Sequence, residues 1–213
     1  IRLKSVDVID EIDFSGNIHG MKYHFLQRSQ FNNPIREYSK EKDIDFGYWG
    51  RMKSGETERE QMIKHIYRDD DISTMLVGGF PAGVKRDAGW IKNWKVLHPM
   101  LEPRRTTLCF NWIDDVATTS RYPEALSIGI VPFVWKNYDS NNTYKIDDWQ
   151  RIHSFDEFHS RVLEVKDGFV FEEKLEEYRN NYKQVLLSEN EYSEQFSNCL
   201  LYTSDAADDL TRV

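Results

Sequence analysis

A short segment near the middle of the chain carries side chains that are suited to hold a nucleotide. Arg121 and Glu124 stand at the start of a predicted short helix, and Gly129 follows that helix. An arginine beside the free N–H groups of a helix N-terminus suits a phosphate. A glutamate one turn along can accept hydrogen bonds from both hydroxyls of a ribose. With Gly129 as a tight exit into an apolar strand over residues 131–135, the segment indicates a sugar-nucleotide pocket.

The alternative for Arg121 and Glu124 is an i,i+3 ion pair on a solvated helix surface, which is worth only about 0.3 kcal/mol. Pro123 lies between the two residues. A proline is tolerated in the first turn of a helix, because its missing N–H has no intrahelical partner there. Pro123 therefore fixes the helix start beside Arg121 and favours the pocket over a generic surface helix.

A second basic segment precedes another predicted helix. Gly50, Arg51, Lys53 and Ser54 lie between a strand and the capped start of that helix. Two cations, a flexible backbone and a hydroxyl at such a position form a plausible cradle for a pyrophosphate. Basic loops before helices are common, so the segment alone is a weak signal. Its pairing with the Arg121 helix strengthens the functional interpretation.

Other polar groups leave two interpretations open. His98, in the sequence His98-Pro99-Met100, fits a loop that recognises a base, and equally a turn with a surface histidine. The pairs Asp114-Asp115 and Asp147-Asp148 suit a divalent metal bound to phosphates, and equally the acidic loops of an acidic protein. A divalent metal is therefore possible, and no resident cofactor is assigned.

No nucleophile with a neighbouring general base is recognisable. The remaining histidines lie on different predicted elements, without a partner at a useful spacing: His19, His24, His65, His153 and His159. We therefore assign no catalytic residue within this chain.

Strands and helices alternate from about residue 43 onward. The pattern predicts strands over 44–48, 74–77, 108–113 and 131–135, an extended piece from Lys95 that is broken at His98, and a loop over 81–93. Helices are expected after Thr57, Arg121 and Ser154 and in the last part of the chain. Two helical faces are predicted to be buried: Phe155, Phe158, Val162 and Leu163, and then Phe171, Leu175, Tyr178, Tyr182 and Val185.

Repeated β-α units with continuous apolar strands predict an α/β fold, a Rossmann-like parallel sheet with helices on both faces. In such a sheet the ligand lies beyond the carboxyl ends of the strands. Both basic segments described above are expected at that edge.

From about residue 43 to residue 187 the chain resembles the C-terminal, donor-binding domain of GT-B glycosyltransferases, and most nearly the DNA β-glucosyltransferases of T-even-type bacteriophages. In that family a Tyr-Gly-Gly turn with a phosphate-binding arginine leads into a helix, and an Arg-x-x-Glu helix follows. Here Tyr48 to Gly55 takes the first place, with Lys53 where that arginine is expected, and Arg121-x-x-Glu124 takes the second. Two features depart from the family pattern. Lysine is a point charge where arginine is bidentate, and Thr57 stands where a second arginine is expected, so Arg51 or Arg59 would have to compensate.

The resemblance implies a nucleotide-sugar donor, UDP-glucose in the simplest case, with Arg121 at the pyrophosphate and Glu124 at the ribose. It places His98 in the loop that reads the uracil. It implies direct displacement, with the catalytic aspartate in an N-terminal domain, and hydroxymethylcytosine of double-stranded phage DNA as the acceptor. The alternatives are a glycan, lipopolysaccharide or protein acceptor, or a nucleotide-binding module without catalysis.

The composition of the chain limits the partners and the cellular compartment that we expect. The formal net charge of −8 argues against this segment wrapping nucleic acid by itself, because duplex binding depends on neutralising phosphates. No signal peptide or membrane-length apolar run is recognisable, so no membrane insertion is expected. Cys109 in an apolar run predicts a small core residue without a disulfide. These features are consistent with a reducing, cytoplasmic compartment, and the resemblance implies that of a bacterium or of a phage-infected host cell.

The organisation predicted from these observations has four parts. Residues 1–42 are expected to be the remnant of a preceding domain and a linker, residues 43–187 the donor-binding domain, and residues 188–198 the end of the natural sequence. Residues 199–213 resemble the in-frame translation of a sequencing adaptor, which would make them foreign to the fold. An acidic native tail is the alternative.

Overall fold

A computed structural model describes residues 35–52, 55, 57–80, 82–91, 93–111, 119–139, 142 and 144–185, with the backbone alone at residues 57 and 94. The predictions for Lys53, Ser54 and the pair Asp114-Asp115 lie outside the described residues. So do the predictions for residues 1–34 and for the tail over 199–213.

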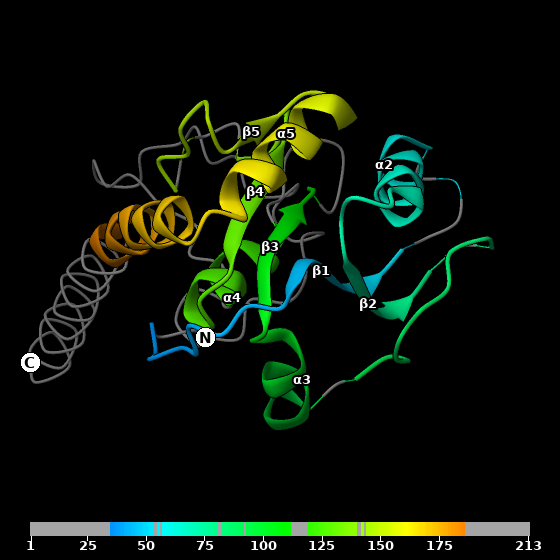
Figure 1. The fold of residues 1–213 in the computed structure, drawn as a ribbon, viewed down its shortest axis with the longest axis horizontal. Helices are drawn as coiled ribbons and strands as arrows, with labels where there is room; N and C mark the ends of the chain where they lie inside the picture. Colours follow the sequence, from blue (N-terminus) through cyan, green and yellow to red (C-terminus); the bar gives the residue numbers. More distant parts are fainter. Residues whose placement is uncertain are drawn as a thin grey trace, which may run out of the picture.

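The core of the molecule is a five-stranded, all-parallel sheet with the strand order β2-β1-β3-β4-β5 (Figure 1). The strands are β1 (Ile44–Arg51), β2 (Thr74–Gly79), β3 (Arg104–Cys109), β4 (Val131–Trp135) and β5 (Arg151–Ile152). The helices are α2 (Thr57–Arg68), α3 (Trp94–Leu101), α4 (Arg121–Ser127) and α5 (Phe155–Val165), and residues 168–185 are also helical. This architecture confirms the predicted α/β, Rossmann-like class.

Helices cover both faces of the sheet, as the sequence predicts. Phe46 of β1 packs edge-on against Phe158 of α5, with ring centroids 5.4 Å apart, in the larger of two hydrophobic clusters. Trp49, on the other face of the same strand, belongs to a second cluster with Leu97 of α3 and Ala125 of α4. This alternation follows from the two-residue period of a strand. It places α2 and α5 on one face and α3 and α4 on the other.

The chain adds β2 on one side of β1 and then β3 on the other side, so the order of the strands reverses between β1 and β3. The chain leaves β1 toward α2 on one face, and it leaves β3 toward α4 on the opposite face. The ladder between β1 and β3 pairs Ile44 with Arg104 and Phe46 with Thr106, and it does not continue to the carboxyl ends of the strands. A parallel sheet of this kind binds ligands in the crevice at such a switch point.

Two predicted elements differ from the structure. The segment from Lys95 is helix α3, not an extended piece, because Asn93 Oδ1 accepts a hydrogen bond from the Lys95 N–H (3.0 Å) and starts a helix that contains Pro99. Strand β3 begins at Arg104 and ends at Cys109, earlier than predicted. Its polar start is stabilised by the Thr106 hydroxyl, which donates to the backbone oxygen of Asp45 (2.6 Å).

A short strand and one helix residue also differ from the prediction. Strand β5 has only two residues and is missing from the prediction. Leu163, predicted to be inward, is 39% exposed, whereas Val165 of the same helix is fully buried. Val165 lies three residues after Val162 and seven after Phe158, so it extends their buried stripe, which Leu163 does not join.

Several other predictions are confirmed. Helix α4 begins at Arg121, and Gly129 has φ +77° just beyond its end, where a β-carbon would collide with the Tyr38 side chain. Cys109 is a free, buried thiol. The stripe of the last described helix is buried throughout, at Phe171, Leu175, Tyr178, Tyr182 and Val185.

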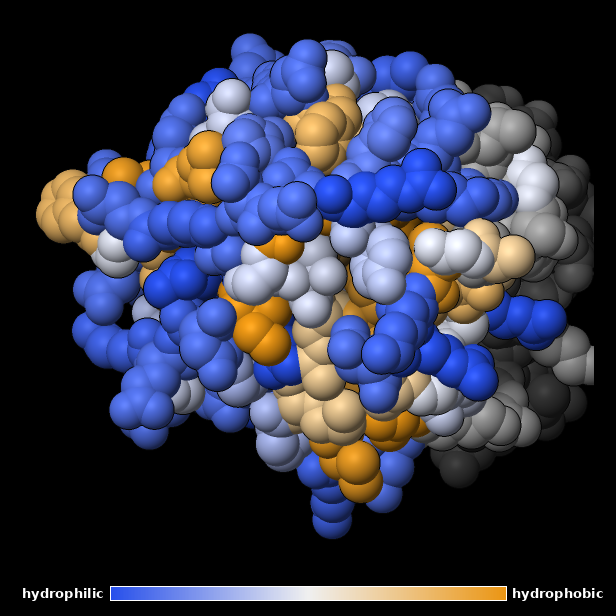
Figure 2. Space-filling model, turned by 45° about the vertical axis from the view of Figure 1, so that its right-hand side comes forward, coloured by the Kyte–Doolittle hydropathy of each residue, from blue (hydrophilic) through white to orange (hydrophobic). Residues whose placement is uncertain are grey.

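Polar side chains cover most of the face shown in Figure 2, and apolar ones gather in its lower middle part. The large apolar side chains that are exposed among the described residues are Trp90, Val96, Leu163 and Phe169. They lie on or beside α3, α5 and the helix that follows α5. None of them belongs to the strand ends at the carboxyl edge of the sheet.

Two glycines allow the ends of β1 and β2 to approach each other. Gly50 and Gly78 are paired in the ladder and have φ +131° and +133°. A β-carbon on Gly78 would overlap the backbone oxygen of Gly50. Gly83 also has a positive φ of +88°, but a β-carbon there would meet no atom within 4 Å.

We predict that Gly78→Ala destabilises the fold by about 3 kcal/mol, because it adds a backbone collision to an unfavourable φ. Gly83→Ala is the matched control and should cost about 1 kcal/mol, the φ strain alone. Urea denaturation of the two variants measures both values. Equal losses at the two positions would contradict the close contact between Gly50 of β1 and Gly78 of β2.

Candidate functional site

The Arg121 side chain lies near the carboxyl end of β1, at the switch point where the ladder between β1 and β3 has stopped; we call this place the crevice. The side chain is buried, with 6% of the residue exposed. Nε donates a hydrogen bond to the Trp49 backbone oxygen (3.1 Å), and Nη2 donates to the same oxygen. The guanidinium lies over the Tyr48 ring, 4.1 Å from its centroid. The third nitrogen, Nη1, is buried and has no hydrogen-bond partner among the described residues.

The backbone of β1 makes room for this guanidinium. The ladder to β3 stops before Trp49, which leaves the Trp49 carbonyl free to accept from Arg121. A β-carbon on the next residue, Gly50, would come within 2.7 Å of Arg121 Nη2. The guanidinium therefore fits here because Gly50 has no side chain.

Glu124, one turn along α4, is also buried, with 8% exposed. Its Oε2 accepts a hydrogen bond from the indole Nε1–H of Trp49 (3.0 Å). Arg121 and Glu124 form no ion pair with each other, because each is bound to Trp49 instead. The i,i+3 surface pair, which was the alternative interpretation of these residues, is therefore not what the fold contains.

A second arginine lies at the same edge. Arg59 of α2 donates from Nε to the Tyr48 hydroxyl (2.8 Å), and its guanidinium lies 5.8 Å from the Tyr48 ring centroid. The Tyr48 ring therefore contacts both Arg59 and Arg121. Arg51, the last residue of β1, is exposed at this edge. The two arginines named as possible substitutes for a missing family arginine thus lie close to the crevice.

Sequence reasoning missed the parts played by Tyr48 and Trp49. The predicted strand ends at Tyr48, with Trp49 just after it, whereas both residues lie within β1. Tyr48 supports the two arginines, and Trp49 binds both Arg121 and Glu124. The available signal was a pair of aromatic residues immediately before the glycine of a basic turn.

His98 lies elsewhere. It is in the last turn of α3, just before β3 begins, so it is near the amino edge of the sheet (Figure 1). Burial, and then the positive charge of Arg36, lower the pKa of His98. The structure does not bring it together with Arg121 and Glu124, and its role at a base remains a prediction from the sequence.

Cys109, at the carboxyl end of β3, is not a nucleophile. Burial raises the pKa of its thiol to about 12, so the sulfur stays protonated at neutral pH. The charges that act on it include those of Arg121, Glu124 and Arg59, which indicates that β3 ends close to the crevice.

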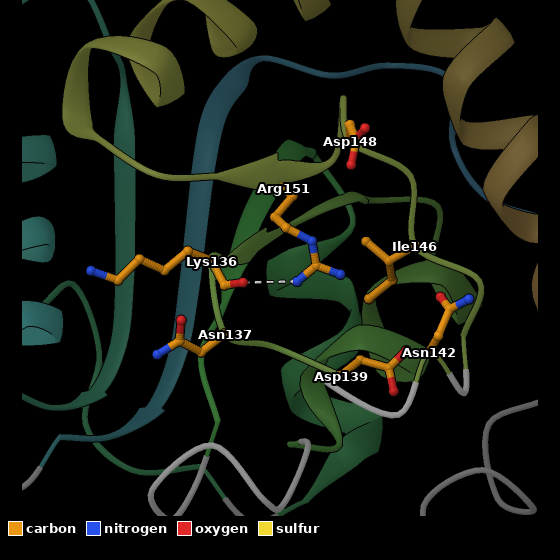
Figure 3. Close-up of a pocket in the computed structure, with 7 residues that line it drawn as sticks. All are labelled: Lys136, Asn137, Asp139, Asn142, Ile146, Asp148 and Arg151. Carbon is orange, nitrogen blue, oxygen red and sulfur yellow. Dashed lines mark hydrogen bonds between the residues drawn. The ribbon is translucent and has the colours of Figure 1, made fainter.

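A pocket of about 540 Å³ lies beyond the carboxyl end of β4 (Figure 3). It is lined by Lys136, Asn137, Asp139, Asn142, Ile146, Asp148 and Arg151. Arg151 is held from one side, because its Nη1 donates to the backbone oxygens of Lys136 (3.0 Å) and Tyr138 (2.8 Å). Lys136 Nζ forms an ion pair with Glu58 (2.8 Å). Asp139 and Asp148 balance the two cations of the lining, so the pocket suits a neutral ligand with hydroxyl groups better than an anion.

One group of described residues has the composition of a metal site. Single ligand atoms of Asp69, Asp71 and His159 lie within 4.8 Å of one another, where the end of α2 meets α5. That position is at the amino edge, just before β2, and away from Arg121. Asp147 has a structural contact, since it accepts the Gln150 N–H (2.7 Å).

Across the described ranges, no helix is long and apolar enough to cross a membrane.

Comparisons with known proteins agree with this geometry. No family model matches the chain, and no curated protein matches it. Among solved structures, the DNA-modifying β-glucosyltransferase solved with and without uridine diphosphoglucose matches with a TM-score of 0.64 and 15% identity. The match covers 80% of this chain and 55% of that one. This chain has the fold of one half of a GT-B glycosyltransferase.

Two further solved structures support the same fold. Bacteriophage T4 β-glucosyltransferase in complex with UDP and Mn²⁺ matches with a TM-score of 0.63 and 17% identity, over 80% of this chain and 53% of that one. TarM matches with a TM-score of 0.56 and 11% identity, over 77% of this chain and 37% of that one. The chain spans about half the length of the phage structures that it matches.

Proposed function

We propose that this chain is the donor-binding half of a glycosyltransferase and holds a UDP-sugar, UDP-glucose in the simplest case, in the crevice between β1 and β3. The observation that carries the proposal is Arg121. It is a buried guanidinium with no carboxylate partner and with Nη1 unbonded among the described residues. A buried cation and an unsatisfied buried donor are both unfavourable. A diphosphate would satisfy both.

The surrounding groups fit the same ligand. Arg59 and Arg51 add positive charge at the edge, and Gly50 makes room for the Arg121 guanidinium. Lys53 and Ser54 extend this cradle in the prediction made from the sequence. Glu124, with Oε2 bound to Trp49, offers its second oxygen to the ribose hydroxyls.

In this account, catalysis by this half is electrostatic. Negative charge grows on the diphosphate as it leaves the sugar, and fixed cations stabilise that charge without a covalent intermediate. An acceptor hydroxyl would displace the diphosphate directly, with a base supplied by the other half of the enzyme. A divalent ion at the diphosphate would need carboxylates beside Arg121. The described residues place Glu124 there, already bound to Trp49, so we derive no step through a metal.

The hexose of the donor would lie in the pocket beyond β4. Carboxylate and amide groups accept and donate hydrogen bonds to sugar hydroxyls. Asp148 and Asn137 line this pocket with exposed side chains. Tyr138, buried between the lining residues Asn137 and Asp139, donates its hydroxyl to the Thr119 oxygen (2.8 Å), two residues before Arg121.

For the acceptor, we propose hydroxymethylcytosine in DNA. The support is the likeness in fold to a DNA-modifying β-glucosyltransferase. The target base would have to be flipped out of the duplex to reach the donor. A glycan, lipopolysaccharide or protein acceptor is the alternative, with the same donor site.

We predict that Arg121→Ala weakens UDP binding by about 2 kcal/mol, or roughly 30-fold in Kd, because a charge-assisted contact is lost. Arg104→Ala is the matched control, since Arg104 is a similarly buried arginine (5% exposed) at the amino edge of the same sheet. Calorimetric titration of both variants measures the difference. An unchanged Kd for Arg121→Ala, or an equal loss in both variants, would contradict the assignment.

Asp148→Ala is expected to weaken binding of UDP-glucose by about 1 kcal/mol through loss of a hydrogen bond to a hydroxyl, and to leave UDP binding unchanged. The same change at Asp156, an acidic residue in the first turn of α5, serves as a control for charge alone. Competition binding with the two ligands separates these outcomes. A loss for UDP as large as that for UDP-glucose would place the hexose elsewhere.

The acceptor is tested with a longer form of the protein that includes the preceding domain. We expect it to transfer labelled glucose from UDP-glucose to DNA that contains hydroxymethylcytosine, but not to the same DNA with cytosine. Transfer to a glycan, lipopolysaccharide or protein in place of DNA would keep the donor assignment and reject the acceptor.

A further inference from the structure

One residue holds both side chains that are assigned to the nucleotide. Trp49 binds Arg121 through its backbone oxygen and Glu124 through its indole N–H. We propose that Trp49 is a positioning residue that makes the site selective for ribonucleotides over 2′-deoxyribonucleotides, by fixing the carboxylate of Glu124. This inference rests on the proposed nucleotide-binding function.

The indole itself is held in place. Trp49 is 5% exposed and packs in the hydrophobic cluster that contains Leu97 of α3 and Ala125 of α4. Its N–H donates to Glu124 Oε2 at 3.0 Å, and no other hydrogen bond to that carboxylate comes from the described residues. A carboxylate held at one oxygen by a rigid donor keeps one orientation. Its second oxygen then serves as a fixed acceptor for a ribose hydroxyl.

The contacts of Trp49 are chemically separable. Its hydrogen bonds with Arg121 use the backbone carbonyl, which every residue type at this position retains. The indole ring also lies 5.6 Å from the Arg121 guanidinium, and phenylalanine at this position keeps an aromatic face for that contact. The contact with Glu124 needs the indole N–H. Removing the N–H therefore releases the carboxylate assigned to the ribose, and it leaves the arginine assigned to the diphosphate in place.

The same kind of contact occurs elsewhere in the chain. Two other tryptophans of the chain donate to glutamates, but at exposed positions: Trp135 to Glu58 and Trp149 to Glu164, both at 3.1 Å. They supply a matched control for the chemistry of the pair.

The experiment compares the Kd values of UDP, 2′-deoxy-UDP and inorganic pyrophosphate by calorimetry, for the unaltered chain, Trp49→Phe and Trp149→Phe. The unaltered chain and Trp149→Phe should bind UDP about 10-fold or more tightly than 2′-deoxy-UDP, because a hydrogen bond to a carboxylate is lost with the hydroxyl. In Trp49→Phe that ratio should fall close to one, with the Kd of pyrophosphate unchanged. Melting curves check that each variant is folded.

A retained ratio in Trp49→Phe would overturn the inference while leaving the proposed function intact. An equal loss for all three ligands would also overturn it, since Trp49 would then act only through packing. If the unaltered chain bound neither UDP nor pyrophosphate, the proposed function itself would fail, and this inference with it. Should Trp49→Phe not fold, Trp49 replaced by β-benzothienylalanine keeps the bicyclic shape, removes only the N–H, and must give the same loss of discrimination.

Discussion

The candidate site depends on the contact between the Trp49 carbonyl and the Arg121 guanidinium. In an uninterrupted sheet, that carbonyl would face the neighbouring strand. Here the ladder between β1 and β3 stops at Phe46 and Thr106, because the two strands lead to helices on opposite faces. Arg121 supplies the donors that β3 does not, and it links the first helix turn of α4 to the end of β1.

The same contact explains the neighbouring residues. A guanidinium away from water is stabilised by the faces of aromatic rings, and Tyr48 and Trp49 provide two, with centroids 4.1 Å and 5.6 Å from Arg121. Gly50 is required because a side chain there would crowd Nη2. Glu124 is oriented by Trp49 and not by Arg121, so no carboxylate among the described residues neutralises the guanidinium. Under the proposed function, such a site is preorganised for an anion, because the cation is already desolvated in the folded protein.

Much of this arrangement could be predicted from the sequence, for reasons that are local. Pro123 fixed the start of α4, Gly129 its exit, and a regular apolar stripe the last helix. The errors occurred where tertiary contacts outweigh local pattern. Arg104 lies in a strand because its side-chain stem packs across Gly47 of β1, a contact that no pattern in residues 104–107 indicates.

The same limit applies to the site. Arg121 and Glu124 were recognisable because their spacing relative to Pro123 and Gly129 is a local signal. The role of Trp49 depends on a hydrogen bond across 75 residues of sequence, which the spacing of residues does not show. The pocket beyond β4 is likewise formed by the path of a connection, with Asp139 and Asn142 at φ +54° and +53°.

The most direct test of the central claim is a calorimetric titration of this chain with UDP, with NAD as the control dinucleotide. The account predicts saturable binding of UDP in the crevice between β1 and β3, and no response to NAD. Equal binding of both ligands would contradict a site built around Arg121 and Glu124 for a uridine diphosphate. The absence of any UDP binding would contradict the claim that the buried Arg121 guanidinium is a preformed partner for a diphosphate.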